Sequence, residues 1–336
     1  MAMPARRGKV VASTGEVFFT LKIWYNTFRV RRCSRVKKEA RQWRPSPGLS
    51  ISPALNIRSG VHELSKVSFM SDGVYINTAP KGQRASRFAA LLQALVVRDV
   101  TSRYRRSALG MWWAFLQPMI LMLLFNMLRG FVNIPSDGIP YVLFSYTALV
   151  PWTFFTNAVA ACGPSITTNA EVIKKIALPR EVFPLAAVAA TLFDFCMSGI
   201  LLVGMMIWFK VPVGWSLLWL PILIVLMVAV AYAVGILIAG LGTFRKDFIF
   251  ATPFLTQAWL FATPVIYPLN TVPENWRFYY TLNPMVGVIE GFRNVLLKST
   301  APPTEALGIS IVITGVLLAI AWPVFRRLSG YFADVL

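Results

Sequence analysis

The stretch Thr167–Leu185 reads TTNAEVIKKIALPREVFPL, a charged island between two long apolar runs. Thr168 and Glu171 have the capping-box spacing that begins a helix. We predict a short helix over Ala170–Ala177 that Pro179 ends, because proline disfavours the α conformation in the residue before it. Two interpretations fit: a rigid docking rod, or a loop whose charges only set membrane topology. The charged residues of the island are Glu171, Lys174, Lys175, Arg180 and Glu181.

The composition is that of a membrane protein. Of 336 residues, 56% are hydrophobic and 14% are charged, against about 25% charged in soluble domains. The net charge of +19 invites a nucleic-acid interpretation. However, residues 1–69 alone hold 14 Lys+Arg against 3 Asp+Glu, and the remaining 19 against 11 lie mostly beside apolar runs. Charges so placed set topology, so we expect no nucleic-acid partner.

The chain divides into three parts: a basic leader (1–69), a cytoplasmic leader with an interface helix (70–110), and a transmembrane domain (111–336). The basic leader could lie on anionic lipid or nucleic acid, or be disordered. A third interpretation, which we prefer, is that translation starts at Met70. Three widely spaced cysteines and one histidine indicate neither a disulfide framework nor a metal site.

The predicted fold is an all-α integral membrane domain with six transmembrane helices. Each apolar run holds about the 20 residues needed to cross ~30 Å of hydrocarbon. The predicted spans are 111–133, 139–162, 183–209, 216–244, 248–267 and 306–325. Before them, Arg87–Arg106 has an apolar face typical of a helix in the membrane interface. Its charged residues are Arg98, Asp99, Arg103, Arg105 and Arg106.

The distribution of Lys and Arg predicts that both termini are cytoplasmic. With that orientation, the outer segments carry only Arg129, Lys210, Arg277, Arg293 and Lys298. The inner segments carry Arg98, Arg103, Arg105, Arg106, Lys174, Lys175, Arg180, Arg245, Lys246, Arg326 and Arg327.

One segment on the outer side, Leu282–Leu297, is too polar to span the membrane and too apolar for a free loop. Asn283 and Pro284 are a plausible helix start, and Glu290 and Arg293 are i,i+3 neighbours on one face. We interpret it as a re-entrant or interfacial helix, with a plain surface cap as the alternative.

Two ionisable residues fall within predicted spans. A charge at the bilayer centre costs about 2.5–3.5 kcal/mol on insertion scales, so each needs a partner or water. Arg129 lies near the outer end of its span and can extend its side chain to the interface. Asp194 lies well inside its span, and is either a functional carboxylate or a hydrogen-bond acceptor between helices.

The sequence lacks the motifs that would indicate chemistry of its own. No G-x-x-x-x-G-K-[ST] phosphate-binding motif occurs, and no catalytic cluster of convincing spacing is found. We therefore expect no enzyme activity and no bound cofactor. Energised work would need a gradient or another subunit.

Several stretches in register resemble the permease subunits of ABC-2 type polysaccharide exporters, over about Phe88–Leu336. They are RYRRSALGMWWAFLQPM (103–119), IPSDGIPYVLFSYTALVPWTFF (134–155), NAEVIKKIALPREVFPL (169–185), FRKD (244–247), NPMVGVIEGFRNVLL (283–297) and FRRLSGYFADVL (325–336). That family exports O-antigen, capsular polysaccharide or teichoic acid on lipid carriers across the bacterial cytoplasmic membrane.

The resemblance implies a homodimer of six-helix subunits that works with two copies of a separate ATP-binding subunit, which holds ATP and Mg. Thr168–Phe183 would be the coupling helix seated on that ATPase, and Arg87–Arg106 the interface helix beside it. Asn283–Leu297, with Asn283, Glu290 and Arg293, would match the external gate helices.

A glycan pore would need aromatic faces for sugar rings, although aromatic residues at span ends also anchor helices at the membrane interface. The candidates are Trp112, Trp113, Phe115, Phe125, Trp152, Phe155, Trp259 and Tyr267. Three other functions stay open: an ABC-2 permease for a small lipid or drug, a gradient-driven carrier built around Asp194, and a membrane glycosyltransferase or ligase.

Overall fold

The computed structural model describes residues 81–336, apart from residues 106, 108, 133, 137 and 176–177. The side chains of residues 81–87, 132, 175 and 333–334 are also outside the description. The predicted leader and the proposed start at Met70 therefore lie outside the described residues. Every regular element within them is a helix, which confirms the all-α class for this part of the chain.

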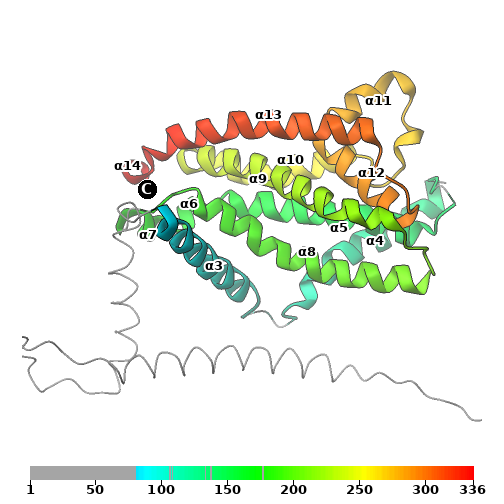
Figure 1. The fold of residues 1–336 in the computed structure, drawn as a ribbon, viewed down its shortest axis with the longest axis horizontal. Helices are drawn as coiled ribbons and strands as arrows, with labels where there is room; N and C mark the ends of the chain where they lie inside the picture. The colour runs from blue at the N-terminus through cyan, green and yellow to red at the C-terminus, as the bar shows by residue number, and fades with distance from the viewer. Residues whose placement is uncertain (1–80, 106, 108, 133, 137, 176–177) are drawn as a thin grey trace, which may run out of the picture. The chain divides into compact units, whose positions relative to one another are not determined.

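Five helices in the described part are long and apolar enough to cross a membrane. They are α4 (Trp112–Val132), α5 (Tyr141–Cys162), α8 (Val182–Trp208), α9 (Leu220–Phe244, preceded by the 3-10 turn η1, Trp215–Trp219) and α13 (Thr304–Ser329). They match the first, second, third, fourth and sixth predicted spans to within a few residues. Figure 1 shows α13, α9, α5 and α8 alongside one another, each in contact with the next.

The fifth predicted span, Phe248–Tyr267, is too long as predicted. The helix there, α10 (Asp247–Phe261), has 15 residues and ends six residues early. At about 1.5 Å per residue it extends about 22 Å, less than the ~30 Å of hydrocarbon. The chain after it contains Pro264 and Pro268, which have no N–H for a helical hydrogen bond.

α5 is the central helix of the bundle. It contacts α4, α8, α9, α10 and α12, and most of its residues are buried. Its buried hydroxyls bond within the helix: Ser145, Thr147 and Thr153 each donate to the carbonyl four residues earlier, at 2.8 Å. This pairing lets polar residues lie in an apolar environment.

A glycine sets the distance between α5 and α9. A Cβ atom at Gly235 would lie 2.7 Å from the Sγ of Cys162, so any larger residue would push the helices apart. Small residues at such crossings let backbones approach closely where lipid supplies no hydrophobic drive for association.

The remaining helices are short or lie at the ends of the long ones. They are α3 (Lys81–Arg105), α6 (Ser165–Thr168), α7 (Ala170–Lys175), the 3-10 turn η2 (Leu269–Thr271), α11 (Glu274–Thr281), α12 (Pro284–Leu297) and α14 (Phe332–Val335). α3 confirms the predicted amphipathic helix, and α12 confirms the predicted helix start at Asn283 and Pro284.

A second apolar cluster lies where α3, α6, α7 and α14 meet the ends of α8, α9 and α13. Leu95 of α3, Ile173 of α7, Phe183 of α8, Phe325 of α13 and Phe332 of α14 are all buried in it. The charged island is therefore packed onto the bundle and is not a free loop.

Candidate functional site

The charged island folds as two short helices. The predicted capping residue, Thr168, lies in the last turn of α6, where its N–H donates to the Pro164 carbonyl at 2.9 Å. The capping-box prediction is therefore wrong. Asn169 begins α7, because its carbonyl accepts the N–H groups of Val172 at 3.0 Å and Ile173 at 3.1 Å.

Two of the predicted docking residues lie on the surface of α7. Glu171 and Lys174 are exposed, whereas the Lys175 side chain is outside the description. α7 lies at the same end of the bundle as the C-terminus in Figure 1. It therefore presents charged side chains next to an apolar cluster, as a docking element would.

The other two charged residues of the island contact the C-terminal part of the chain. The Arg180 guanidinium lies 5.8 Å from the centre of the Phe332 ring of α14. A Glu181 carboxylate oxygen lies 3.8 Å from the Nε atom of Arg326 in the last turn of α13. These contacts stabilise the turn between α7 and α8, which is a role the sequence did not predict.

α3 is bonded to the start of α7. Arg98 donates from Nη1 to the Asn169 Oδ1 at 2.8 Å, and from Nε and Nη2 to the Asp99 Oδ1 at 3.0 and 2.8 Å. Asn169 in turn donates to the Ser165 carbonyl at 2.7 Å. Of the remaining predicted residues of this helix, Arg105 is exposed and Arg106 is outside the described residues.

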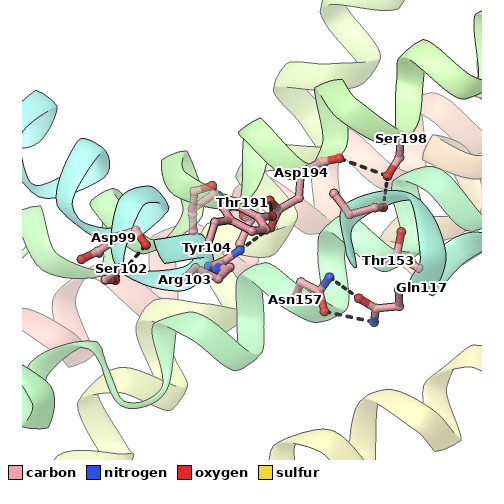
Figure 2. A network of polar contacts seen from close by, with 12 residues as sticks. Asp99, Ser102, Arg103, Tyr104, Gln117, Thr153, Asn157, Thr191, Asp194 and Ser198 are labelled. Atoms are coloured by element: carbon pink, nitrogen blue, oxygen red, sulfur yellow. Dashed lines mark hydrogen bonds and ion pairs between the residues drawn. The ribbon is translucent and has the colours of Figure 1, made fainter. Parts of the chain in front are cut away.

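The far end of α3 bonds the carboxylate in α8. Arg103 pairs with one oxygen of Asp194, and the Tyr104 hydroxyl donates to the other. Figure 2 shows both side chains extending from α3 to Asp194. The predicted need for a partner at Asp194 is thus met by two donors about 90 positions earlier in the chain.

The surroundings of Tyr104 favour its neutral hydroxyl. Burial, and after it the hydrogen bond to Asp194, raise the pKa of the Tyr104 hydroxyl well above its ordinary value. The hydroxyl is therefore a hydrogen-bond donor at every physiological pH. Its ring also packs beside Phe193, with the ring centres 6.1 Å apart.

A cavity of about 280 Å³ with both polar and apolar walls lies beside this carboxylate, between α3, α4, α5 and α8. Its walls include Asp194 and a pair of amides, Gln117 of α4 and Asn157 of α5, that hydrogen-bond each other at 3.0 and 3.3 Å. The volume is close to the lower end of the ~300–1,000 Å³ usual for small-molecule sites. The polar side chains in its walls offer hydrogen-bond partners for water beside Asp194.

Ser198 joins the same network to the first long helix. Its hydroxyl lies 2.7 Å from the Ala114 carbonyl of α4 and 3.0 Å from the Asp194 carbonyl. It stands one turn after Asp194 on α8, so α8 is bonded to α3 and α4 within one turn of helix (Figure 2).

α12 forms a second polar assembly at the other end of the helices. The side chain of Asn283 accepts the Met285 N–H at 3.0 Å and donates to the Thr263 hydroxyl at 2.7 Å. The predicted contact of Glu290 with Arg293 is confirmed at 2.9 Å.

Arg293 replaces the helical hydrogen bonds that the chain loses after α10. It is only 1% exposed, and it donates to the carbonyls of Pro264 at 2.7 Å, Val265 at 2.6 Å and Tyr267 at 3.3 Å. Its guanidinium also lies 3.8 Å from the centre of the Phe144 ring of α5. One buried cation therefore joins α12, the segment after α10, and α5.

The predicted pore aromatics divide by burial. Trp112 and Trp113 of α4 are exposed at 59% and 50%, and four others are half-buried: Phe115, Phe125, Trp259 and Tyr267. Trp152 and Phe155 are buried, and the Phe155 ring packs edge-on against Trp259 at 5.2 Å. The rings of Trp152 and Phe155 belong to the core of the chain, so these two residues are not kept as candidates for a pore wall.

Arg129 lies 5.0 Å from the centre of the Tyr141 ring, a cation–π contact at the end of α4.

Within the described residues, no three His, Cys, Asp or Glu side chains gather as a metal site.

Sequence reasoning missed Tyr104, Asn169 and the amide pair Gln117–Asn157. The amide pair could have been found from the sequence, because Gln117 and Asn157 lie within apolar spans, where each amide needs a hydrogen-bond partner.

Comparison with known proteins identifies the family. The model of the ABC-2 type transporter family matches residues 90–297, more than half of the chain. The chain belongs to this family. It is therefore a multi-pass membrane protein, in agreement with its five long apolar helices.

The chain is similar to proteins named for O-antigen export and for polysialic acid transport. The chain is 28% identical over 252 residues to the O-antigen export system permease protein RfbA of Myxococcus xanthus, covering 74% of this chain and 96% of that protein. It is 26% identical to a protein of the same name from Klebsiella pneumoniae, covering 73% and 95%. It is 22% identical to the polysialic acid transport protein KpsM of Escherichia coli, covering 70% and 92%.

Proposed function

We propose that this chain is the permease subunit of an ATP-driven exporter that moves a lipid-linked polysaccharide across the bacterial cytoplasmic membrane. The observation that carries the proposal is the likeness to O-antigen export permeases along nearly their whole length. Likeness to a polysialic acid transport protein supports the same substrate class. ABC-2 membership favours this function over a carrier driven by a gradient.

The proposed subunit crosses the membrane six times with both termini in the cytoplasm. α10, with the chain after it, makes the fifth crossing, and Arg293 bonds the carbonyls that this non-helical end leaves without helical partners. Irregular backbone is tolerated at membrane depth where protein groups satisfy it. α11 and α12 then lie on the outer side, where they cap the exit.

The energy comes from a separate ATP-binding subunit, which carries the ATP and Mg. Two copies of this chain and two of the ATPase make the proposed exporter.

The exposed side chains Glu171 and Lys174 of α7 would contact the ATPase, with Lys175 beside them in sequence. ATP-driven closure of the ATPase dimer would move α7 as a rigid element and open a pore between the two permeases. The exposed rings Trp112 and Trp113 would lie at its cytoplasmic entrance.

Complementation in the source bacterium tests this function. Deletion of the gene should leave the lipid-linked glycan on the cytoplasmic side and the cell surface bare. The surface glycan can be measured by periodate oxidation and labelling with a membrane-impermeant hydrazide dye. Expression of this chain should restore the label. A deletion strain whose surface label equals that of the wild type would contradict the proposal.

A further inference from the structure

The polar network of Figure 2 links α3 to α8 and to α4, the first long helix. The bond from Arg98 to Asn169 joins α3 to the start of α7, the proposed ATPase-docking helix. We propose that Arg103, Tyr104 and Asp194 form a latch that transmits the movement of α7 into α8 and α4, and that the three are positioning residues for export. The inference rests on the proposed function, because it needs an ATPase to move α7.

The first step is the joint between α7 and α3. Arg98 bonds Asn169, the residue that begins α7, at 2.8 Å. Leu95 of α3 and Ile173 of α7 are also buried in the same apolar cluster. Through this bond and this cluster, we expect a displacement of α7 to reach α3.

The second step is the latch itself. Arg103 and Tyr104 follow Arg98 by five and six residues on α3, and between them they bond both oxygens of Asp194 in α8. Each donor fixes a different oxygen, so a displacement of α3 acts on α8 through two bonds. A carboxylate inside an apolar helix cannot lose both donors unless another partner replaces them.

The third step is the passage into α4. Ser198 follows Asp194 by one turn and lies 2.7 Å from the Ala114 carbonyl. α4 begins with the exposed rings of the proposed pore entrance. The described contacts are thus continuous from α7 through α3 and α8 to α4.

The cavity gives the latch a second state. It lies against Asp194, and its amide pair, Gln117 and Asn157, can hold water there. In the closed state the carboxylate is bonded to α3, and in the open state water from the cavity replaces Tyr104. A discrete element with two arrangements is what coupling between distant sites requires.

Conservative variants of the latch test the proposal in the complete exporter. Tyr104→Phe keeps the ring beside Phe193 and removes only the donor, and Asp194→Asn keeps the shape and removes the charge. We measure the amount of assembled complex, phosphate release from ATP by the purified complex, and surface glycan by the hydrazide label. Tyr331→Phe is the matched control, because that tyrosine is exposed at the start of α14.

Each latch variant should lower surface glycan per ATP hydrolysed by about tenfold, within the roughly 5–150-fold range of allosteric couplings. Assembly and ATP hydrolysis should stay at wild-type levels. The double variant should be no worse than the worse single one, because both act through one contact.

Unchanged export in both single variants would overturn the latch. Loss of the complex, or a fall of export and ATP hydrolysis in equal proportion, would also overturn it, since the residues would then only maintain the fold. If the wild-type complex itself hydrolyses no ATP and exports no glycan, the proposed function fails, which is a separate result.

Discussion

At the scale of single residues, Arg293 donates hydrogen bonds to backbone carbonyls that have no helical partner after α10. The chain leaves the α conformation after Phe261, and the carbonyls of Pro264 and Val265 accept bonds from one guanidinium instead. A buried arginine with this many acceptors is a structural centre, so the proposed gate role of Arg293 is to hold α12 and the segment after α10 together.

Arg293→Met should therefore destabilise the protein strongly. It removes the donor while leaving buried carbonyls and the Glu290 carboxylate behind, a loss of about 3–5 kcal/mol for a broken buried pair. Thermal unfolding in detergent should show a melting midpoint lowered by several degrees.

The matched control is Arg277→Met on α11. Arg277 also donates to carbonyls, at 3.0 and 3.2 Å, but its side chain is 40% exposed. Solvent can replace such bonds, so the expected loss is under about 1 kcal/mol. Equal melting midpoints for the two variants would contradict the role assigned to Arg293.

Residue-level prediction from sequence was partial for a physical reason. The cost of a charge in lipid showed that Asp194 needs a partner, but not which one. Arg103 was named for its charge alone, and Tyr104 carried no signal, because tyrosine is common at membrane interfaces. The contact of Arg180 with Phe332 joins residues far apart in sequence, so only the fold reveals it.

At the scale of elements, α7 is the proposed docking surface for the ATPase. Lys174→Glu reverses an exposed charge on the proposed docking face and should weaken the permease–ATPase complex. Because Lys174 is exposed, the melting midpoint of the permease should not change. Co-purification of the ATPase at increasing salt measures the effect, which should be largest at low salt and shrink as salt screens the exposed charges.

Lys210→Glu is the control for this charge reversal, since Lys210 is exposed in the link between α8 and η1 on the predicted outer side. It should leave the complex intact at every salt concentration. Identical salt profiles for Lys174→Glu and the wild type would remove α7 from the proposed interface.

The elements differ in how well the sequence predicts them. Five long apolar runs gave helices close to the predicted bounds, because a run of about 20 apolar residues leaves few alternatives. The end of α10 was missed, because apolar residues continue through Tyr267 while the two prolines end the helix first. α6 and α14 have four residues each, too few for a periodic pattern.

At the scale of the whole molecule, the chain has helices long enough to cross a membrane. Its sequence contains no G-x-x-x-x-G-K-[ST] motif for binding the phosphates of ATP. A permease of the ABC-2 family needs an ATPase to supply the energy. We therefore expect this chain to work only in a complex with a nucleotide-binding subunit.

The most direct measurement is a pull-down of the tagged chain from native membranes in mild detergent, with mass spectrometry of the proteins recovered in stoichiometric amount. We expect an ATPase with a G-x-x-x-x-G-K-[ST] motif in equal number to the permease. A chain that purifies alone, with no nucleotide-binding partner even after cross-linking, would contradict the claim and the coupling role of α7 with it.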